Sequence, residues 1–157
     1  PMRRKEFAVT DPQQICSILS SCDCCRLGLS DEGRVYIVPM NFGFTQQDGR
    51  FRLYFHSAKE GRKVRLLTQN ECAAFELDCN HQQKAASSAC ENTTCYQSIT
   101  GFGRVHFLTQ LEEKRQGLLH ILRQTTGQTD WEIPDEALHS VCVFVLEADE
   151  LSCKQHN

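Results

Sequence analysis

Short runs in which apolar residues alternate with other residues fill the first third of the chain. Leu53 and Phe55, for example, fall on one face of an extended chain, and the residues between them fall on the other. Such runs lie at 26–29, 35–44 and 51–57, separated by the turn sequences SDEGR and QQDGR. Turn residues at this spacing are typical of antiparallel hairpins. The pattern therefore predicts three consecutive strands as the start of a sheet.

Helical and strand-like patterns alternate through the rest of the chain. Apolar residues recur every three or four positions at about 12–21, 60–69 and 109–125, which predicts three helices. Residues 79–94 show no periodic apolar face and are predicted to form a long loop. Further strands are predicted at 72–78, 95–108 and 141–151. Mostly antiparallel strands with a few flanking helices predict a small β-barrel.

The predicted helix starts carry capping signals. At the first helix, either Thr10 and Gln13 form a capping box or Asp11 caps the helix with Pro12 at its first position. The third helix is expected to open with a second capping box that begins at Thr109.

Size and charge restrict the classes of function. A chain of 157 residues fits one domain, which we expect to span residues 2–154. Seventeen Lys and Arg against twenty Asp and Glu give a formal charge of −3, so no global basic field favours nucleic acid. The sequence has neither an apolar run of membrane-spanning length nor a secretory signal pattern. We therefore expect a cytoplasmic protein that binds neither nucleic acid nor membrane.

Ten cysteines require a choice between disulfides, metal ligands and buried thiols. Only Cys22, Cys24 and Cys25 lie close together, and no second Cys-x-x-Cys or closely spaced His pair accompanies them, so no metal site is expected. Cys72 and Cys142 lie in apolar strand-like runs, where a thiol usually packs as a small hydrophobic group. Most of the cysteines are expected to be reduced.

The segment HSAKEGRK, from His56 to Lys63, is the strongest candidate for a binding site. A strand pattern ends there and a helical pattern begins. The start of a helix presents free backbone N–H groups that suit an anion, and Arg62 and Lys63 add positive charge. The segment is either a phosphate site or a solvated corner with ordinary surface cations, because no glycine-rich P-loop accompanies it.

A series of segments matches one known family in order. The most specific combination is VPMNFG at 38–43, followed by YFHSA at 54–58 and GRK at 61–63. Together with the remaining strands, these segments resemble the pyridoxamine 5′-phosphate oxidase-like, FMN-binding split-barrel proteins, and among them the nitroimidazole-resistance branch. The resemblance extends over residues 2–154. It implies a mainly β, antiparallel split barrel with flanking helices.

The resemblance also implies a cofactor and its contacts. FMN would lie in a groove at a dimer interface, with its phosphate paired to cations at the helix start. Ser98 would offer a polar side chain to the flavin, or it is an ordinary strand serine satisfied by the backbone. The implied FMN contacts are Val38, Pro39, Met40, Asn41, Phe55, His56, Ser57, Arg62, Lys63 and Ser98.

An FMN-dependent oxidoreductase that reduces a small substrate, such as a nitroaromatic compound, is the first hypothesis for function. The flavin would supply the chemistry, so no acid–base triad is needed. His56 is the candidate catalytic residue, as a proton donor, or it is a structural histidine bonded to the phosphate. The chain ends in LSCKQHN without the arginine and histidine pair of the true oxidases, so oxidation of vitamin B6 is not expected.

Two alternatives come from other classes. The chain could be a non-catalytic flavin- or haem-binding module, or a redox or metal protein centred on Cys22, Cys24 and Cys25. No motif selects one haem ligand among the candidate histidines, which are His81, His106, His120 and His139.

A homodimer with shared flavin sites is also expected. A barrel of about six strands is too small to enclose a flavin, so the cofactor must lie on an outer face that a two-fold partner could cover. Segments Ile99–Phe107 and Val38–Phe44 are expected to meet in that interface. Alternatively, the predicted loop at 79–92 closes the groove within one chain.

Overall fold

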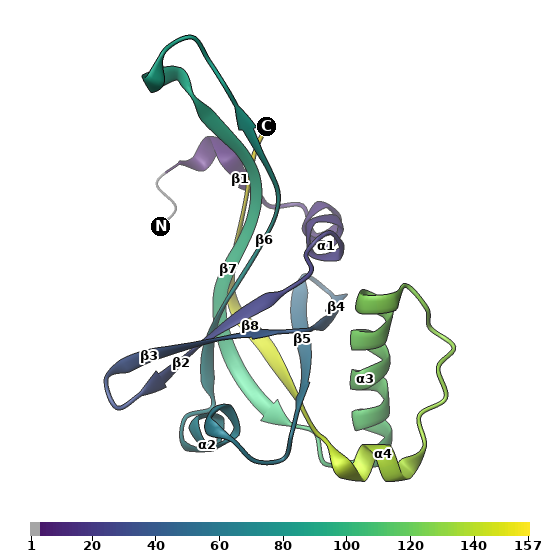
Figure 1. Ribbon diagram of the computed structural model, residues 1–157. Helices are drawn as coiled ribbons and strands as arrows, with labels where there is room; N and C mark the ends of the chain where they lie inside the picture. Colours follow the sequence, from purple (N-terminus) through teal and green to yellow (C-terminus); the bar gives the residue numbers. More distant parts are fainter. Residues whose placement is uncertain (1–3) are drawn as a thin grey trace.

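The computed structural model describes residues 4–157, which form an antiparallel sheet with helices packed around it (Figure 1). The strands are β1 (Ala8–Val9), β2 (Cys25–Asp31), β3 (Arg34–Met40), β4 (Gly43–Gln47), β5 (Arg50–Ser57), β6 (Cys72–Lys84), β7 (Thr93–Phe107) and β8 (Cys142–His156). The helices are α1 (Pro12–Ser20), α2 (Arg62–Gln69), α3 (Leu111–Thr126) and α4 (Asp135–Ser140), with 3-10 turns η1 (Lys5–Phe7) and η2 (Ala89–Glu91). Within this part of the chain, none of the helices has the length and hydropathy that crossing a bilayer requires.

The sheet is open rather than closed. Its strands follow the order β3-β2-β6-β7-β8-β5-β4, and β1 adds to β8. All pairings are antiparallel. The predicted fold class, a mainly β, antiparallel split barrel with flanking helices, is confirmed, although the sheet has eight strands rather than about six.

Two tight hairpins form where the turn sequences predict them. Glu32 and Gly33, between β2 and β3, have φ angles of 51° and 81°, and Asp48 and Gly49, between β4 and β5, have φ angles of 52° and 76°. Positive φ at both central residues is typical of type I′ turns, whose twist matches that of the paired strands.

The prediction of a three-strand meander is wrong for its middle strand. The run 35–44 is not one strand, because β3 ends at Met40 and β4 begins at Gly43. These two strands lie at opposite ends of the sheet. Phe42, between them, is fully buried. The run is apolar throughout because it holds two strands and a buried connection, which the alternation pattern alone does not separate.

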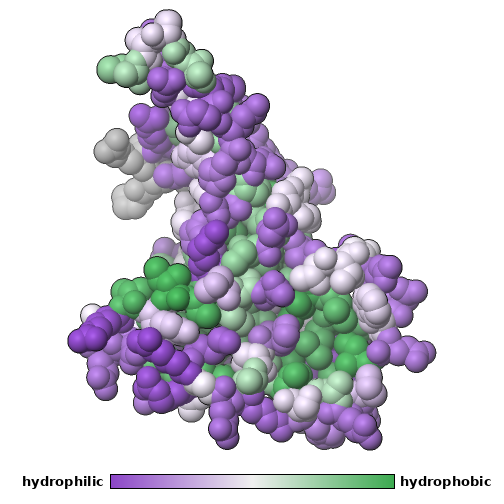
Figure 2. Space-filling model, in the orientation of Figure 1, coloured by the Kyte–Doolittle hydropathy of each residue, from purple (hydrophilic) through white to green (hydrophobic). Residues whose placement is uncertain are grey.

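The predicted loop at 79–94 is largely a two-stranded ribbon. β6 continues to Lys84 and β7 begins at Thr93, and these two residues pair directly. The ribbon projects beyond the barrel (Figure 1), and Figure 2 shows it to be largely polar. Residues 80–92 are all exposed. Backbone pairing holds the ribbon together, and neither of its faces is buried. Its sequence therefore has no alternation of apolar residues that would predict strands.

The helix starts follow the capping signals in part. Asp11 caps α1 by accepting a hydrogen bond from the backbone N–H of Gln14 at 3.1 Å, and Pro12 takes the first helical position. The second of the two predicted arrangements is therefore the observed one. The capping box at Thr109 is wrong, because the cap residue of α3 is Gln110 and no side chain caps this helix.

Helix α3 packs across β4 and β5 and buries an unexpected set of residues. Its buried positions are Lys114, Gly117 and Ile121. The Lys114 ammonium donates to the backbone carbonyl of Val141 at 2.7 Å and to that of Leu138. These two bonds allow a cation to be buried beneath the end of α4.

Close contact between α3 and β4 depends on Gly43. A Cβ atom there would overlap backbone atoms of His120 and Ile121, whereas a Cβ atom on Gly28 would meet Ala74 at an ordinary 3.6 Å. We expect Gly43→Ala to lower the free energy of unfolding by about 3 kcal/mol, because backbone atoms cannot move aside. Urea titration should show this loss, with Gly28→Ala within about 1 kcal/mol of wild type. Equal stability of the two variants would show that α3 can shift away from β4.

Candidate functional site

The β5–α2 corner (residues 56–63) has the geometry of an anion site. β5 ends at Ser57 and α2 begins at Arg62, with Gly61 as the cap residue. Gly61 has a backbone φ of 137°, an angle that residues other than glycine rarely adopt. Among the side chains of residues 4–157, none caps α2, and the first turn of this helix has no acidic residue. The first backbone N–H groups of the helix are therefore free of side-chain acceptors, as an anion site requires.

Lys63 and His56 come together in this corner. Burial lowers the pKa of His56, and the nearby charge of Lys63 lowers it further. Lys63 is partly buried, and it has no ion-pair partner within residues 4–157. The corner therefore holds a free cation beside an imidazole that is mostly neutral at neutral pH.

Ser57 forms the floor of the corner. Its side chain is 8% exposed, and its hydroxyl donates to the Ala58 carbonyl at 2.8 Å. Cys142 lies opposite it on β8. Burial raises the pKa of the Cys142 thiol, while the Ser57 hydroxyl, Lys114 and Lys63 act in the opposite direction. Two cations and a hydroxyl therefore lie near one another around the end of β5.

Arg62 ties the corner to the β2–β3 hairpin. Its Nε and Nη2 atoms donate to Asp31 Oδ2 at 2.9 and 2.7 Å. Its guanidinium carbon lies 4.2 Å from the centroid of the Tyr36 ring. The hydrogen bonds from Arg62 hold the pKa of Asp31 below its usual range, so the carboxylate is ionised at neutral pH.

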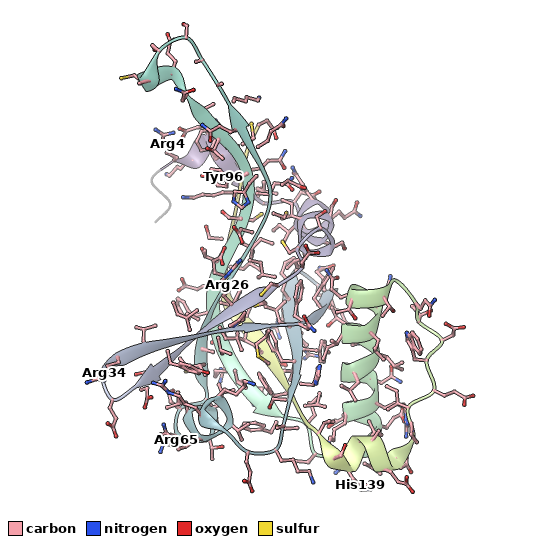
Figure 3. All side chains as sticks on the ribbon, in the orientation of Figure 1. Arg4, Arg26, Arg34, Arg65, Tyr96 and His139 are labelled. Carbon is pink, nitrogen blue, oxygen red and sulfur yellow. The ribbon has the colours of Figure 1, made fainter. Side chains whose placement is uncertain are left out.

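The β2–β3 hairpin has two different faces. Asp31 faces α2, where it also meets Arg65 at 3.5 Å. Pro39 and its cross-strand partner Arg26 face away, because successive residues of a strand point to opposite sides. Figure 3 shows Arg65 on the α2 side of the hairpin and Arg26 on the other. A ligand anchored at the corner would therefore lie against the Asp31 face or along the free edge of β3.

Three of the predicted contacts lie on β3, and the fourth, Asn41, directly follows it. Val38 is partly buried and Met40 is 7% exposed, and both face inward, whereas Pro39 and Asn41 are exposed. β3 stands at one end of the sheet order, so one of its edges has no strand partner within residues 4–157. The main chain of this strand, rather than its inward side chains, is available to a ligand.

Two other predicted contacts are placed differently. The Phe55 side chain is fully buried and stacks on Phe144 at 5.3 Å, so only its backbone could meet a cofactor. Ser98 lies on β7, three strand positions away from β3, which corresponds to about 14 Å at the usual strand spacing. One chain therefore brings His56, Ser57, Arg62 and Lys63 together but leaves Ser98 apart.

An apolar surface lies on the outward face of the sheet. Ile37, Gly28, Ala74 and Phe102 follow one another across four strands in register. Ile37 is 63% exposed and Phe102 49%, and Val35 next to this row is 75% exposed. Figure 2 shows an apolar patch over the β2–β3 hairpin. We call these five residues the outer patch.

The amino-acid sequence matches the family model described as pyridoxamine 5′-phosphate oxidase over residues 11–155. The chain belongs to this family. The family predicted from the sequence is therefore confirmed. No curated protein matches the chain.

Several solved structures have a similar fold. A proposed 5-nitroimidazole antibiotic resistance protein from Bacteroides thetaiotaomicron is 32% identical, with a TM-score of 0.81 over 95% of this chain and 86% of that one. The flavocytochrome Anf3 from Azotobacter vinelandii is 19% identical, with a TM-score of 0.80 over 100% and 72%. An FAD and haem binding protein from Mycobacterium smegmatis is 19% identical, with a TM-score of 0.81 over 96% and 74%. The second and third similarities are evidence of fold alone.

Among the clustered cysteines, Cys22 and Cys25 are buried and Cys24 is partly buried. Within residues 4–157, no group of three or more His, Cys, Asp or Glu side chains is placed to hold a metal ion. Burial raises the pKa of the Cys22 and Cys25 thiols strongly, which keeps them protonated and poorly nucleophilic. Cys72 is exposed and Cys142 is partly buried, so the prediction of two buried strand thiols is wrong for Cys72. Its position at the start of β6 leaves it outside the core.

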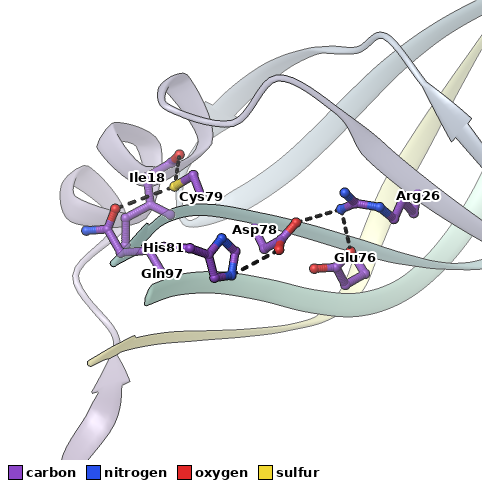
Figure 4. Close-up of polar contacts among 7 residues, drawn as sticks. All are labelled: Ile18, Arg26, Glu76, Asp78, Cys79, His81 and Gln97. Carbon is purple, nitrogen blue, oxygen red and sulfur yellow. Dashed lines mark hydrogen bonds and ion pairs between the residues drawn. The ribbon is translucent and has the colours of Figure 1, made fainter. Parts of the chain in front are cut away.

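An ion-pair network crosses the outward face beside the outer patch (Figure 4). Arg26 bonds Glu76 at 2.9 Å and Asp78 at 2.6 Å, and His81 bonds Asp78 at 3.2 Å. Cys79 in the same view donates to backbone and side-chain oxygens and does not contact His81. The network is a solvated surface feature, with no paired nucleophile and base.

The histidines considered as haem ligands lie on separate elements. His81 belongs to β6 and is paired with Asp78, whereas the His120 ring on α3 packs at a tilt against the Tyr54 ring, with the ring centroids 4.8 Å apart. Burial, and then the charge of Arg123, lowers the pKa of His120. The other two, His106 on β7 and His139 on α4, are exposed.

Five hollows on the surface formed by residues 4–157 lie away from the β5–α2 corner. One, of about 770 Å³, is lined by residues of the β4–β5 hairpin from Thr45 to Tyr54. Another, of about 610 Å³, lies between α1, α3 and β4.

Asp31 and Tyr36 are the site residues that sequence reasoning missed. They contact Arg62 from 31 and 26 positions away along the chain, as the residue numbers give. No local spacing links them to the corner. From the sequence alone, the segment SDEGR predicts only a turn. The role of Asp31 becomes visible only because the fold places this residue beside α2.

Proposed function

We propose that the protein is an FMN-binding flavoprotein that reduces a small substrate such as a nitroaromatic compound. The supporting observation is the β5–α2 corner, which combines free helix N–H groups, the unpaired Lys63 and the hydroxyl of Ser57. A phosphomonoester with two negative charges matches such a corner. The 32% identity to the proposed nitroimidazole resistance protein supports the choice of substrate class.

β3 would accommodate the ring system of the flavin. Within residues 4–157, no strand pairs its free edge, which carries backbone C=O and, except at Pro39, N–H groups over Val38–Met40. Such groups can bond the pyrimidine edge of an isoalloxazine and thereby bias its reduction potential. The bonds from Arg62 to Asp31 at the end of β2, and its contact with Tyr36 on β3, fix the β2–β3 hairpin against the proposed phosphate corner.

His56 is the candidate proton donor of this site. The bound flavin would supply electrons to the substrate, as is usual for flavoproteins. Burial and Lys63 keep the pKa of His56 low, so the imidazole alone would be mostly neutral at neutral pH. An anion bound in the corner would raise that pKa by opposite charge. His56 would therefore be a better proton donor in the loaded protein.

A homodimer would complete the site. Ser98 lies three strand positions, or about 14 Å, from β3 within one chain, so a second copy could bring a Ser98 closer to a flavin bound along β3. The outer patch supports pairing, because an exposed apolar face on this scale is typical of interaction surfaces. A two-fold partner would cover this patch.

An absorption spectrum of the purified protein tests the proposed function first. We expect flavin bands, which the phosphate-bearing FMN should restore after removal. Under anaerobic conditions, the reduced protein should be reoxidised by a nitroimidazole and not by buffer. A colourless protein that takes up no FMN would refute the proposal, and a haem spectrum would favour the haem-binding module instead.

Substitution of Arg62 or Lys63 should weaken FMN binding. Lys63→Ala and Arg62→Ala should each reduce the binding free energy of FMN by about 1.5–3 kcal/mol, the range for hydrogen bonds to charged groups. Riboflavin, which lacks the phosphate, should lose little. Fluorescence titration of the apoprotein measures both, with Lys59→Ala as a control for loss of one exposed positive charge in the same loop. Equal losses for FMN and riboflavin would place these cations away from the phosphate.

Sedimentation at micromolar concentration should give about twice the monomer mass, and removal of FMN should loosen the dimer. Ile37→Lys should shift the protein toward monomer, because it places a charge in the outer patch. Gln47→Lys, on the exposed end of β4, serves as the matched control. A monomer that holds FMN tightly would contradict the shared site.

A further inference from the structure

The Arg62 side chain is held before any anion binds. A guanidinium group has two edges that each present two parallel N–H bonds, one formed by Nε and Nη2 and the other by Nη1 and Nη2. Either edge matches a carboxylate or a phosphate. Asp31 accepts from Nε and Nη2 at 2.9 and 2.7 Å, so it occupies the side edge and leaves the end edge free.

Two further contacts fix this arrangement. The Tyr36 ring covers one face of the guanidinium at 4.2 Å, which restricts rotation of its plane. Arg65 approaches the other Asp31 oxygen at 3.5 Å. The Asp31 side chain is only 15% exposed, whereas that of Arg62 is 51% exposed. The carboxylate is therefore the more buried part of the cluster, and the Arg62 side chain is half exposed.

The charge of the cluster remains favourable to an anion. Arg62 and Arg65 contribute two positive charges against one negative charge on Asp31, and the unpaired Lys63 follows directly in the chain. Asp31 thus removes part of the attraction for an anion but supplies a defined direction for the fork. For a long side chain, loss of rotamer freedom on binding is a real cost, and a fork that is already oriented avoids much of it.

We propose that Asp31 and Tyr36 are positioning residues that hold the free edge of Arg62 toward the phosphate of the flavin. This inference rests on the proposed function and assigns two residues to it that the sequence does not indicate. The change in anion affinity that it predicts on removal of Asp31 is opposite in sign to the change that simple electrostatics predicts. Removal of a carboxylate near an anion site would ordinarily strengthen anion binding, whereas loss of this carboxylate weakens it.

The first test compares FMN and riboflavin on variants of Asp31. We expect Asp31→Ala to weaken FMN binding about tenfold, equivalent to about 1.4 kcal/mol, with riboflavin affinity changed less than about twofold. Asp31→Asn keeps an acceptor oxygen and should recover part of the loss. Glu32→Ala removes the neighbouring, exposed acidic side chain of the same turn and should leave or slightly raise FMN affinity. Thermal unfolding of each apoprotein confirms that it is folded.

The second test is a double-mutant cycle through Arg62. If Asp31 acts by orienting that side chain, Asp31→Ala should have no further effect on FMN affinity in an Arg62→Ala background. Tyr36→Phe should behave like wild type, because the ring is retained, and Tyr36→Leu should lose FMN affinity selectively.

Four outcomes would overturn the positioning role. The first is tighter FMN binding by Asp31→Ala, which would make the carboxylate a competitor of the phosphate. The second is an equal loss of riboflavin affinity in Asp31→Ala, and the third is an undiminished loss of FMN affinity when Asp31→Ala is made in the Arg62→Ala background. The fourth is a wild-type protein that takes up neither flavin. Only the last of these also refutes the proposed function, so the two failures are distinguishable.

Discussion

Burial of Phe42 is the constraint on which the arrangement of the sheet depends. This residue separates β3 from β4, and its full burial draws the chain through the interior between them. The strands before and after it therefore lie at opposite ends of the sheet order. Because those ends do not pair, the barrel stays split, and β3 keeps a free edge on which a planar ligand could form backbone hydrogen bonds.

The split would separate the two halves of the candidate site if α2 did not bridge it. β5, which ends in Ser57, belongs to the end of the sheet that contains β4, whereas Asp31 belongs to the β2–β3 end. Helix α2 crosses between them and packs against β2. The bonds from Arg62 to Asp31 then fix the first turn of α2 to the hairpin. An exposed ion pair usually stabilises a fold little, so its value here lies in geometry.

Local chemistry was predictable from the sequence, and long-range placement was not. The alternation around Leu53, the two positive-φ turns and the Asp11 cap are each determined by a few neighbouring residues, and the structure has all of them. The ribbon at 79–94 escaped prediction because it has no buried face. Gly43 and Lys114 owe their roles to α3, which is distant in sequence, and the partner of Arg62 is likewise set by the fold.

Arg62 and Lys63 differ in what they can contribute to anion binding. Lys63 has no ion-pair partner in the described chain, so its full charge is available at close range. Arg62 shares its charge with Asp31, and what remains is a directed pair of N–H bonds. A protein with a formal charge of −3 attracts no anion from a distance, so selectivity must come from such short-range geometry. In the proposed site, lysine would supply most of the attraction, and the arginine held by a carboxylate would supply the direction of the N–H bonds to the anion.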